Sequence, residues 1–343
     1  MIDATSGSKM SAPNTALPER LKVLDAMANE ALALWDLPAN SSAQLINISE
    51  NATYLVQSPD GHKSILRVHR DHYHTRRAIE CELAWLEALN EGQIVETSSF
   101  YTGKDGCAIQ EVDTPQLGGS RFLVLFDFVE GVSPDEARDL TDGFEELGAI
   151  AARCHLHATS WTKPKPFERL VWDTDAVFGS EPTWGDWRNA PGVTNDVKVV
   201  LERVELQIVK RLAAYGKASD RYNLIHADMR LANILVGPRG TCLIDFDDCG
   251  YGWLMYDFAA AISFIEDDPR IPKCKEAWLK GYQTVRALSA EDLAEIDTFV
   301  MLRRMALLAW IGSHIEAPEP QKLAAGFAAT TARLGQVWLD SLN

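Results

Sequence analysis

The chain has 343 residues, of which 46% are apolar and 24% charged, so it has the composition of a folded protein and the length of two domains. Its formal net charge of −16 argues against binding to nucleic acid, which usually requires a basic face. The longest apolar stretches, such as residues 305–312, fall short of the roughly 20 residues that span a bilayer. We therefore expect a cytoplasmic protein that binds neither membranes nor nucleic acid.

The first third of the chain alternates between helical and strand patterns. Residues 1–16 are polar and lack the apolar core of a signal peptide, which predicts a flexible tail. The turn sequence SPDG lies between two stretches of alternating apolar and polar residues, the pattern of a β-hairpin. The predicted elements are a helix at 17–37, strands on both sides of SPDG within 44–70, a helix at 76–92, and strands at 107–112 and 121–129.

Beyond a boundary at 129–134 the pattern becomes mostly helical. An exception is the stretch 162–196, which is rich in Pro, Gly and Trp and predicts an irregular insertion. Helices are predicted at 143–161, 197–216, 276–288 and 292–315.

These patterns predict an α+β protein with two lobes. Residues 17–128 would form an N-terminal lobe, a small antiparallel sheet with one main helix. Residues 129–343, including the insertion, would form a larger and mostly helical C-terminal lobe.

Two neighbouring segments carry the chemistry, LIHADMRLANILV at 224–236 and CLIDFDDCGYG at 242–252. Transfer of a phosphoryl group requires a carboxylate that positions the acceptor hydroxyl and oxygen ligands for Mg²⁺. Asp228 is the candidate for the first task. The amide oxygen of Asn233 and the carboxylate of Asp245 are candidates for the second.

The spacing His226-x-Asp228-x-x-x-x-Asn233, followed by Ile244-Asp245-Phe246, resembles the aminoglycoside phosphotransferase family of the protein-kinase-like fold, which includes choline and homoserine kinases. The resemblance implies a bilobal fold in which Asp228 is the catalytic carboxylate. It further implies that Asn233 and Asp245 hold Mg²⁺ and that His226 has a structural role.

The same resemblance assigns a role to Arg230, two positions after Asp228. It would contact the γ-phosphate, with an ordinary surface arginine as the alternative. Upstream, SENATYLV at 49–56 resembles the hairpin that covers the nucleotide phosphates, which implies phosphate contacts for Asn51 and Thr53.

Three further nucleotide contacts follow from the resemblance. Arg67 occupies the place of the nucleotide-binding lysine, and a guanidinium can grip phosphate oxygens in a fork. Its carboxylate partner would be Glu82, with Glu80 as the second candidate. In the stretch FLVLFDFVEGV, the Asp127 carbonyl and the Val129 N–H would bind adenine. Farther along, Asp257 would cap a helix or tie down the catalytic loop.

The sequence thus predicts an ATP- and Mg²⁺-dependent kinase that phosphorylates a hydroxyl of a small molecule, in particular an amino alcohol or a related metabolite. A protein Ser/Thr kinase of the same family and a non-catalytic nucleotide-binding pseudokinase are the alternatives. Candidates for binding an amine are the acidic residues Asp247, Asp248 and Glu266 to Asp268 and the aromatic residues Trp172, Trp184 and Trp187, each with solvated surface or hydrophobic packing as the alternative.

Overall fold

The structure is a computed structural model that describes residues 17–48, 51–134, 140–238 and 240–342. The tail predicted at residues 1–16 lies outside this described part. Within it, no helix is both long and apolar enough to cross a membrane.

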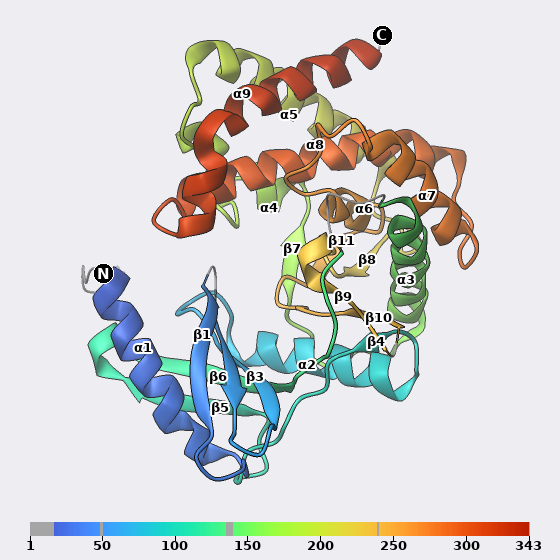
Figure 1. Cartoon of the computed structure of the whole chain (residues 1–343). Coiled ribbons are helices and arrows are strands. Elements are labelled where there is room, and N and C mark those ends of the chain that lie inside the picture. The colour runs from blue at the N-terminus through green and yellow to red at the C-terminus, as the bar shows by residue number, and fades with distance from the viewer. Residues whose placement is uncertain (1–16, 49–50, 135–139, 239, 343) are drawn as a thin grey trace, which may run out of the picture. The chain divides into compact units, whose positions relative to one another are not determined.

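The chain divides into two compact units (Figure 1). The first comprises Met1–Ile79 and Ser99–Phe128, and the second comprises Glu80–Ser98 and Val129–Asn343. Most of helix α2 (Arg76–Glu91) therefore groups with the second unit, although the sequence had assigned it to the N-terminal lobe.

Packing explains the placement of α2. The Trp85 indole N–H donates a hydrogen bond to His157 Nδ1 at 3.2 Å, and the Trp85 ring meets Phe246 edge-on, both within the second unit.

The first unit is built on an antiparallel five-stranded sheet in the order β1-β2-β3-β6-β5. Gln57 pairs with Lys63 across the SPDG turn, so the predicted hairpin is present. The segment 44–70 holds one strand more than this hairpin, because β1 also pairs with β2. The strands are β1 (Ser42–Ile48), β2 (Ala52–Gln57), β3 (Lys63–Val68), β5 (Ile109–Thr114) and β6 (Gly119–Asp127).

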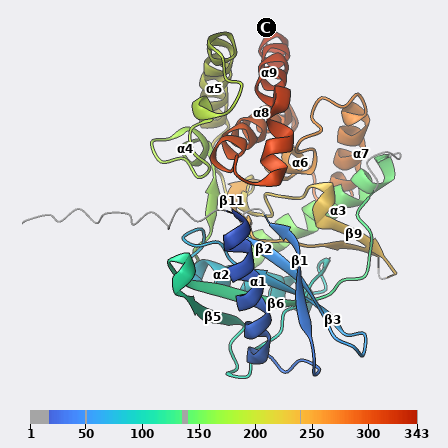
Figure 2. The same ribbon diagram turned by 60° about the vertical axis from the view of Figure 1, so that its left-hand side comes forward.

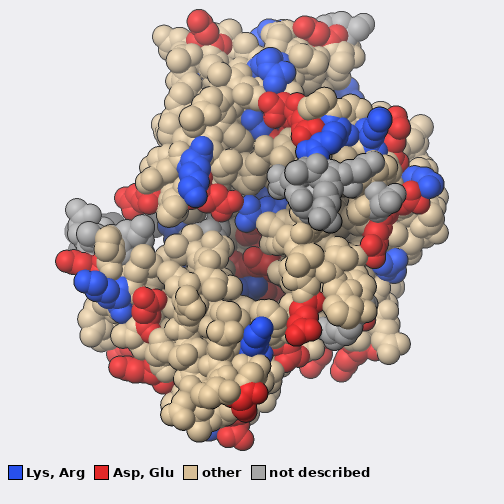
Figure 3. Space-filling view, in the orientation of Figure 1, with Lys and Arg blue, Asp and Glu red and all other residues tan. Residues whose placement is uncertain are grey.

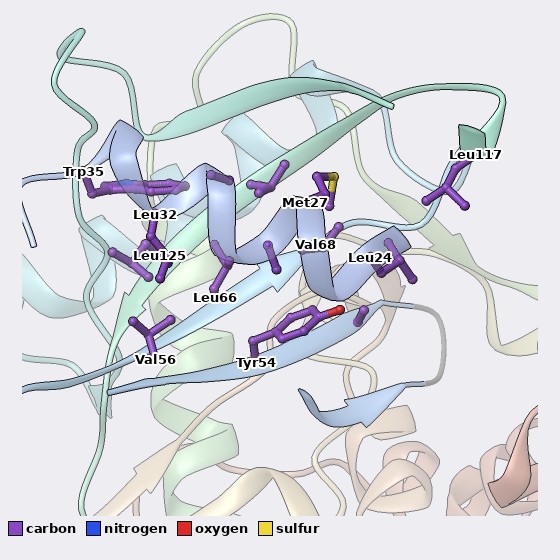
Figure 4. Close-up of a cluster of buried hydrophobic side chains, with 14 residues drawn as sticks. Leu24, Met27, Leu32, Trp35, Tyr54, Val56, Leu66, Val68, Leu117 and Leu125 are labelled. Carbon is purple, nitrogen blue, oxygen red and sulfur yellow. The ribbon is translucent and has the colours of Figure 1, made fainter. Parts of the chain in front are cut away.

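Helix α1 (Leu17–Ala31) lies across this sheet and closes its core (Figure 2). Alternate residues of β2, namely Ala52, Tyr54 and Val56, are buried in that core (Figure 4). Because successive side chains of a strand point to opposite faces, Thr53 is left on the other face of the sheet.

The second unit is mostly helical. Helices α3 and α7 approach each other closely, since a Cβ atom on Gly148 would lie 2.0 Å from the Trp278 carbonyl oxygen and one on Gly281 would lie 1.7 Å from that of Glu145. Helices α5, α8 and α9 pack side by side (Figure 1). The long helices are α3 (Thr141–Ser160), α5 (Asn195–Tyr215), α7 (Ile271–Gln283), α8 (Ala290–Ser313) and α9 (Pro318–Ser341).

Helices α1, α7 and α9 differ from the sequence prediction. Helix α1 was expected at 17–37 but ends at Ala31 and is followed by a 3-10 turn at Leu32–Leu34. Helix α7 was expected at 276–288 but begins at Ile271, because Pro272 fits the first turn of a helix, where no N–H partner is needed. Helix α9 was not predicted; it is interrupted at Ala325 and Gly326, whose backbone is not helical.

The two motif segments, 224–236 and 242–252, include short strands of the second unit. The β-strands of the second unit form two sheets, β4-β10-β9 and β7-β11-β8. The insertion 162–196 is less irregular than predicted, because its segment β7 pairs in parallel with β11. The elements are β4 (Glu96–Thr97), β7 (Leu170–Trp172), α4 (Thr174–Phe178), β8 (Tyr222–Ile225), β9 (Ile234–Gly237), β10 (Gly240–Leu243), β11 (Gly250–Trp253) and α6 (Tyr256–Ala261).

The predicted α+β class is confirmed, with an antiparallel sheet in the N-terminal part and a largely helical C-terminal part. On the face shown in Figure 3, the acidic and basic side chains of the described residues are interspersed rather than gathered by sign.

Candidate active site

A strained loop presents Asp228 at the end of strand β8. Ala227 has a φ of 66°, a left-handed conformation that is unfavourable for a residue with a side chain. The buried Asp257 carboxylate holds this turn by accepting the N–H groups of His226 at 3.1 Å and Ala227 at 2.7 Å. His155 Nε2 in turn lies 2.9 Å from Asp257. As expected from the sequence, Asp257 ties down the loop.

His226 joins this loop to the segment that carries Asp245. The N–H of Asp228 donates to His226 Nδ1 at 3.2 Å, and His226 Nε2 lies 3.1 Å from the Ile244 carbonyl oxygen. These contacts place the proton on Nε2. Burial lowers the pKa of His226, so the ring is neutral and its role is structural.

The Asp228 carboxylate is surrounded by donors. Arg303 Nη2 lies 2.7 Å from Oδ1, and the Asn233 amide donates to Oδ2 at 2.7 Å. Arg230 Nε lies 3.4 Å from Oδ2. The side chain of Asp228 is nevertheless 15% exposed, so a ligand can reach it.

The charge state of Asp228 follows from these contacts. Burial by itself would raise its pKa, but the guanidinium groups of Arg230 and Arg303 outweigh burial and hold the pKa below its usual value. Asp228 is thus a carboxylate at neutral pH. It is a weak base that can accept a hydrogen bond from an acceptor hydroxyl and orient it.

Arg230 connects Asp228 to a second acidic residue. Its Nη1 donates to Glu319 Oε1 at 2.9 Å, and its guanidinium lies 6.0 Å from the centre of the Phe264 ring. The neighbouring charge of Asp228, with a further contribution from Glu319, raises the pKa of Arg230.

The two predicted metal ligands lie at neighbouring strand ends. Strand β10 pairs with β9 so that Leu243 is opposite Ile234, and the Ile244 N–H donates to the Asn233 carbonyl at 3.0 Å. Asn233 Nδ2 donates to Asp228, so Oδ1 remains as a neutral ligand atom. Asp245 is exposed and has a φ of 61°. One amide and one carboxylate oxygen suit Mg²⁺, which keeps its other positions for phosphate and water.

The insertion fixes the loop that follows Asp245. Buried Arg169 donates to the Cys249 carbonyl at 2.7 Å and to that of Asp247, and Trp172 Nε1 donates to the Asp248 carbonyl at 2.8 Å. The segment 246–249 is therefore held through its backbone.

In the first unit, the face of the sheet opposite α1 carries two of the predicted nucleotide contacts, and a third residue precedes strand β2. Thr53 pairs with Arg67 across strands β2 and β3, so their side chains share this face. The Arg67 guanidinium stacks 4.8 Å from the centre of the Phe126 ring. Asn51 accepts the Arg70 N–H at 3.0 Å, which occupies its Oδ1 within the unit.

The remaining predicted contacts are distributed over both units. Glu82 lies on α2 in the second unit and is fully buried. Asp127 ends strand β6 in the first unit, and its N–H donates to the Ser99 carbonyl at 2.9 Å. Val129 begins the second segment of the second unit. Nucleotide binding by these residues stays a prediction.

The side chains considered for amine binding are mostly engaged elsewhere. Trp172 and Trp187 are buried, and Trp187 Nε1 donates to Glu205 at 2.7 Å. Trp184 is covered by the Arg303 guanidinium, 5.2 Å from its ring centre. Glu266 is buried and paired with Arg304.

Two residues were missed from the sequence, one that contacts Asp228 and one that contacts Arg230. Arg303 lies 75 positions after Asp228 along the chain, and Glu319 lies 89 positions after Arg230. The pair Arg303-Arg304 within the apolar stretch FVMLRRMALLAW was a usable signal, because consecutive buried arginines require carboxylate partners. Nothing in the sequence distinguishes Glu319 from other surface acids.

The fold and the arrangement of Asp228, Asn233 and Asp245 are those expected of a phosphotransferase of the protein-kinase-like class. Comparison with known proteins agrees. The sequence model of the family described as "Phosphotransferase enzyme family" matches residues 43–296 of this chain. The chain therefore belongs to that family, as its resemblance to the aminoglycoside phosphotransferases predicted. It is a small-molecule kinase with a hydroxyl group as acceptor.

Several relatives are similar over most of the chain. The structure of the microcompartment-associated aminopropanol kinase is 43% identical, with a TM-score of 0.85, and the match covers 92% of this chain and 98% of that one. The amicoumacin kinase of Bacillus subtilis (strain 168) is 24% identical over 72% of this chain and 74% of its own length. Amicoumacin kinase hAmiN, solved in complex with AMP-PNP, Ca²⁺ and Ami, shares the fold at 20% identity and a TM-score of 0.75, over 92% of this chain and 96% of that one.

Proposed function

We propose that this protein transfers the γ-phosphoryl group of ATP, with Mg²⁺, to the hydroxyl of a short amino alcohol such as an aminopropanol. The observation that best supports this reaction is the contact between Asp228 and Asn233, with Asp245 at the neighbouring strand end. The similarity to an aminopropanol kinase, 43% identical over 92% of the chain, supports the acceptor class.

In this proposal Asp228 accepts the hydrogen bond of the acceptor hydroxyl and directs its oxygen toward the γ-phosphorus. Its lowered pKa limits it to orienting the hydroxyl, so most of the rate enhancement comes from positioning and charge neutralisation. Asn233 holds Asp228 through its amide nitrogen. Bound Mg²⁺, held by Asn233 Oδ1 and the Asp245 carboxylate, would neutralise charge on the phosphates.

The nucleotide contacts belong to the same proposal. Arg67 and Thr53, which share one face of the sheet, would bind phosphate oxygens together with Asn51. The Asp127 carbonyl and the Val129 N–H would bind adenine, and Glu82 would orient Arg67.

A screen of acceptors tests this function. The purified protein is given ATP and Mg²⁺ with aminopropanol isomers, ethanolamine, choline, homoserine, an aminoglycoside and a generic protein substrate, and release of ADP is measured. We expect turnover with an aminopropanol, and a phosphate monoester of that compound as the product. Phosphate found only on protein would favour the protein-kinase alternative. Absence of nucleotide binding at millimolar ATP would favour a pseudokinase.

Replacing Asp245 with Asn should weaken binding of ATP in the presence of Mg²⁺ by at least about 10-fold, because an anionic ligand becomes neutral. Calorimetric titration with and without Mg²⁺ measures this effect. Asp297→Asn is the control, since Asp297 is an exposed aspartate paired only with Lys275 among the described residues. If Asp245→Asn kept the full stimulation of binding by Mg²⁺, Asp245 would not be a metal ligand.

A further inference from the structure

Glu319 lies on a short helical segment that is set apart from the rest of α9. Ala325 has a ψ of 110° and Gly326 a φ of 78°, so the helix breaks between the segment that carries Glu319 and the longer segment that follows (Figure 1). The Glu319 side chain is 36% exposed, and the Arg230 side chain, to which it is bound at 2.9 Å, is 24% exposed. The ion pair is therefore reachable from solvent.

The guanidinium of Arg230 spans two carboxylates. Its Nε lies 3.4 Å from Asp228 Oδ2, and its Nη1 donates to Glu319 Oε1 at 2.9 Å. Asp228 and Glu319 are thus separated by one guanidinium group. A short amino alcohol likewise carries two groups for these carboxylates, a hydroxyl for Asp228 and an ammonium for Glu319.

Aromatic rings line this position. The Phe264 ring lies beneath Arg230 at 6.0 Å and contacts Trp310, with ring centres 5.9 Å apart. Phe264 has a φ of 73°, a strained conformation for an aromatic residue. Aromatic faces attract any cation at this place, whether guanidinium or ammonium.

Resting on the proposed function, we propose that Glu319 binds the ammonium group of the acceptor, and that the Arg230 guanidinium holds this place until the acceptor arrives. The ammonium replaces Arg230 on Glu319, and Arg230 is then released to contact the γ-phosphate. Glu319 selects acceptors that carry an amine. Because the ammonium takes the place of Arg230 on Glu319 and Arg230 then contacts the phosphate, binding of the acceptor is coupled to binding of the phosphate.

The exchange follows from the charges. While Glu319 is bound to Arg230, its negative charge opposes a phosphate that approaches the same guanidinium. An ammonium neutralises Glu319 and removes this opposition. Without an amine, Arg230 stays with Glu319, and transfer of the phosphoryl group to water is suppressed. In that side reaction the bond to the ADP oxygen breaks, a bond to the water oxygen forms, and the water proton passes to solvent.

Glu319→Gln tests the proposal, with Glu145→Gln as a matched control. Glu145 on α3 has a side chain 38% exposed and is paired with Lys280 on α7 at 2.7 Å. For Glu319→Gln we expect kcat/KM for 1-amino-2-propanol to fall about 10–100-fold, mainly through KM. The value for the neutral 1,2-propanediol should not fall, and it should rise together with ATP hydrolysis without acceptor, because Arg230 is no longer held by Glu319. Glu145→Gln should match the wild type in all three measurements.

Calorimetric binding of 1-amino-2-propanol in the presence of ADP and Mg²⁺ gives a readout that needs no turnover. Affinity should fall for Glu319→Gln and stay unchanged for Glu145→Gln. If Glu319→Gln kept both this affinity and the preference for the amine over the diol, the inference about Glu319 would be wrong while the proposed function stood. A wild-type protein that phosphorylated only acceptors without an amine would overturn both.

Discussion

Replacing Asp228 with Asn should lower kcat by about 10²–10⁴-fold, the range typical for loss of a positioned acid–base group. The amide has nearly the shape of the carboxylate, but it loses the charge that orients the acceptor hydroxyl. Steady-state rates with the acceptor identified by the screen provide the measurement.

The same variant should bind ATP and Mg²⁺ nearly as well as the wild type, since the proposed metal ligands are Asn233 and Asp245. Calorimetry and a melting curve separate this outcome from unfolding, which is a concern because Arg303 and Arg230 lose their anionic partner. A folded Asp228→Asn protein with unchanged kcat would exclude Asp228 as the catalytic carboxylate.

The motif could be identified from the sequence because its parts are close along the chain. Asn233 reaches Asp228 from five positions away, and one hairpin brings Asp245 beside Asn233. Local geometry of this kind is encoded in residue spacing. The motif includes Arg230, one cation beside the Asp228 carboxylate, but its spacing does not encode the second, Arg303 on α8.

Long-range contacts account for what the sequence did not predict. Arg303 and Glu319 reach the site from helices α8 and α9, and their places depend on how those helices pack. Helix α9 itself was not predicted, and its backbone breaks at Ala325 and Gly326. Strand β7 was missed because three residues are too few to show a period, although Gly250 leaves room for it: a Cβ there would lie 2.4 Å from the Leu170 carbonyl oxygen.

The role of Arg303 follows from its position on Asp228. It is 2% exposed, donates from Nε to Ser263 at 3.1 Å and from Nη2 to Asp228 at 2.7 Å, and packs on the ring of Trp184. The planar guanidinium of Arg303 makes both polar contacts. It therefore fixes the position of the Asp228 carboxylate and also lowers the pKa of that carboxylate. We expect Arg303 to act on the reaction through Asp228, as a positioning residue.

Replacing Arg303 with Met should lower kcat about 10²-fold, comparable to the loss of one preorganised donor, and should shift the acid limb of the pH–rate profile upward. The direction follows from the pKa. In the wild type the pKa of Asp228 is lowered, so its carboxylate contributes stability in full above its unfolded pKa, and this contribution is lost as the pH falls through the folded pKa. Without Arg303 the folded pKa rises, so activity and stability fall at higher pH than in the wild type.

Arg304→Met is the matched control for this prediction. Arg304 adjoins Arg303, is 3% exposed and is likewise paired with a carboxylate, that of Glu266, while its Nε donates to Thr331 at 3.0 Å. Loss of either buried arginine should lower the melting temperature, because a carboxylate loses its partner. Only Arg303→Met should move the acid limb of kcat, and Arg303→Lys should move it less, since it keeps the charge but loses the fork. An equal shift for both methionine variants would mean that Arg303 supports the helix and has no specific effect on Asp228.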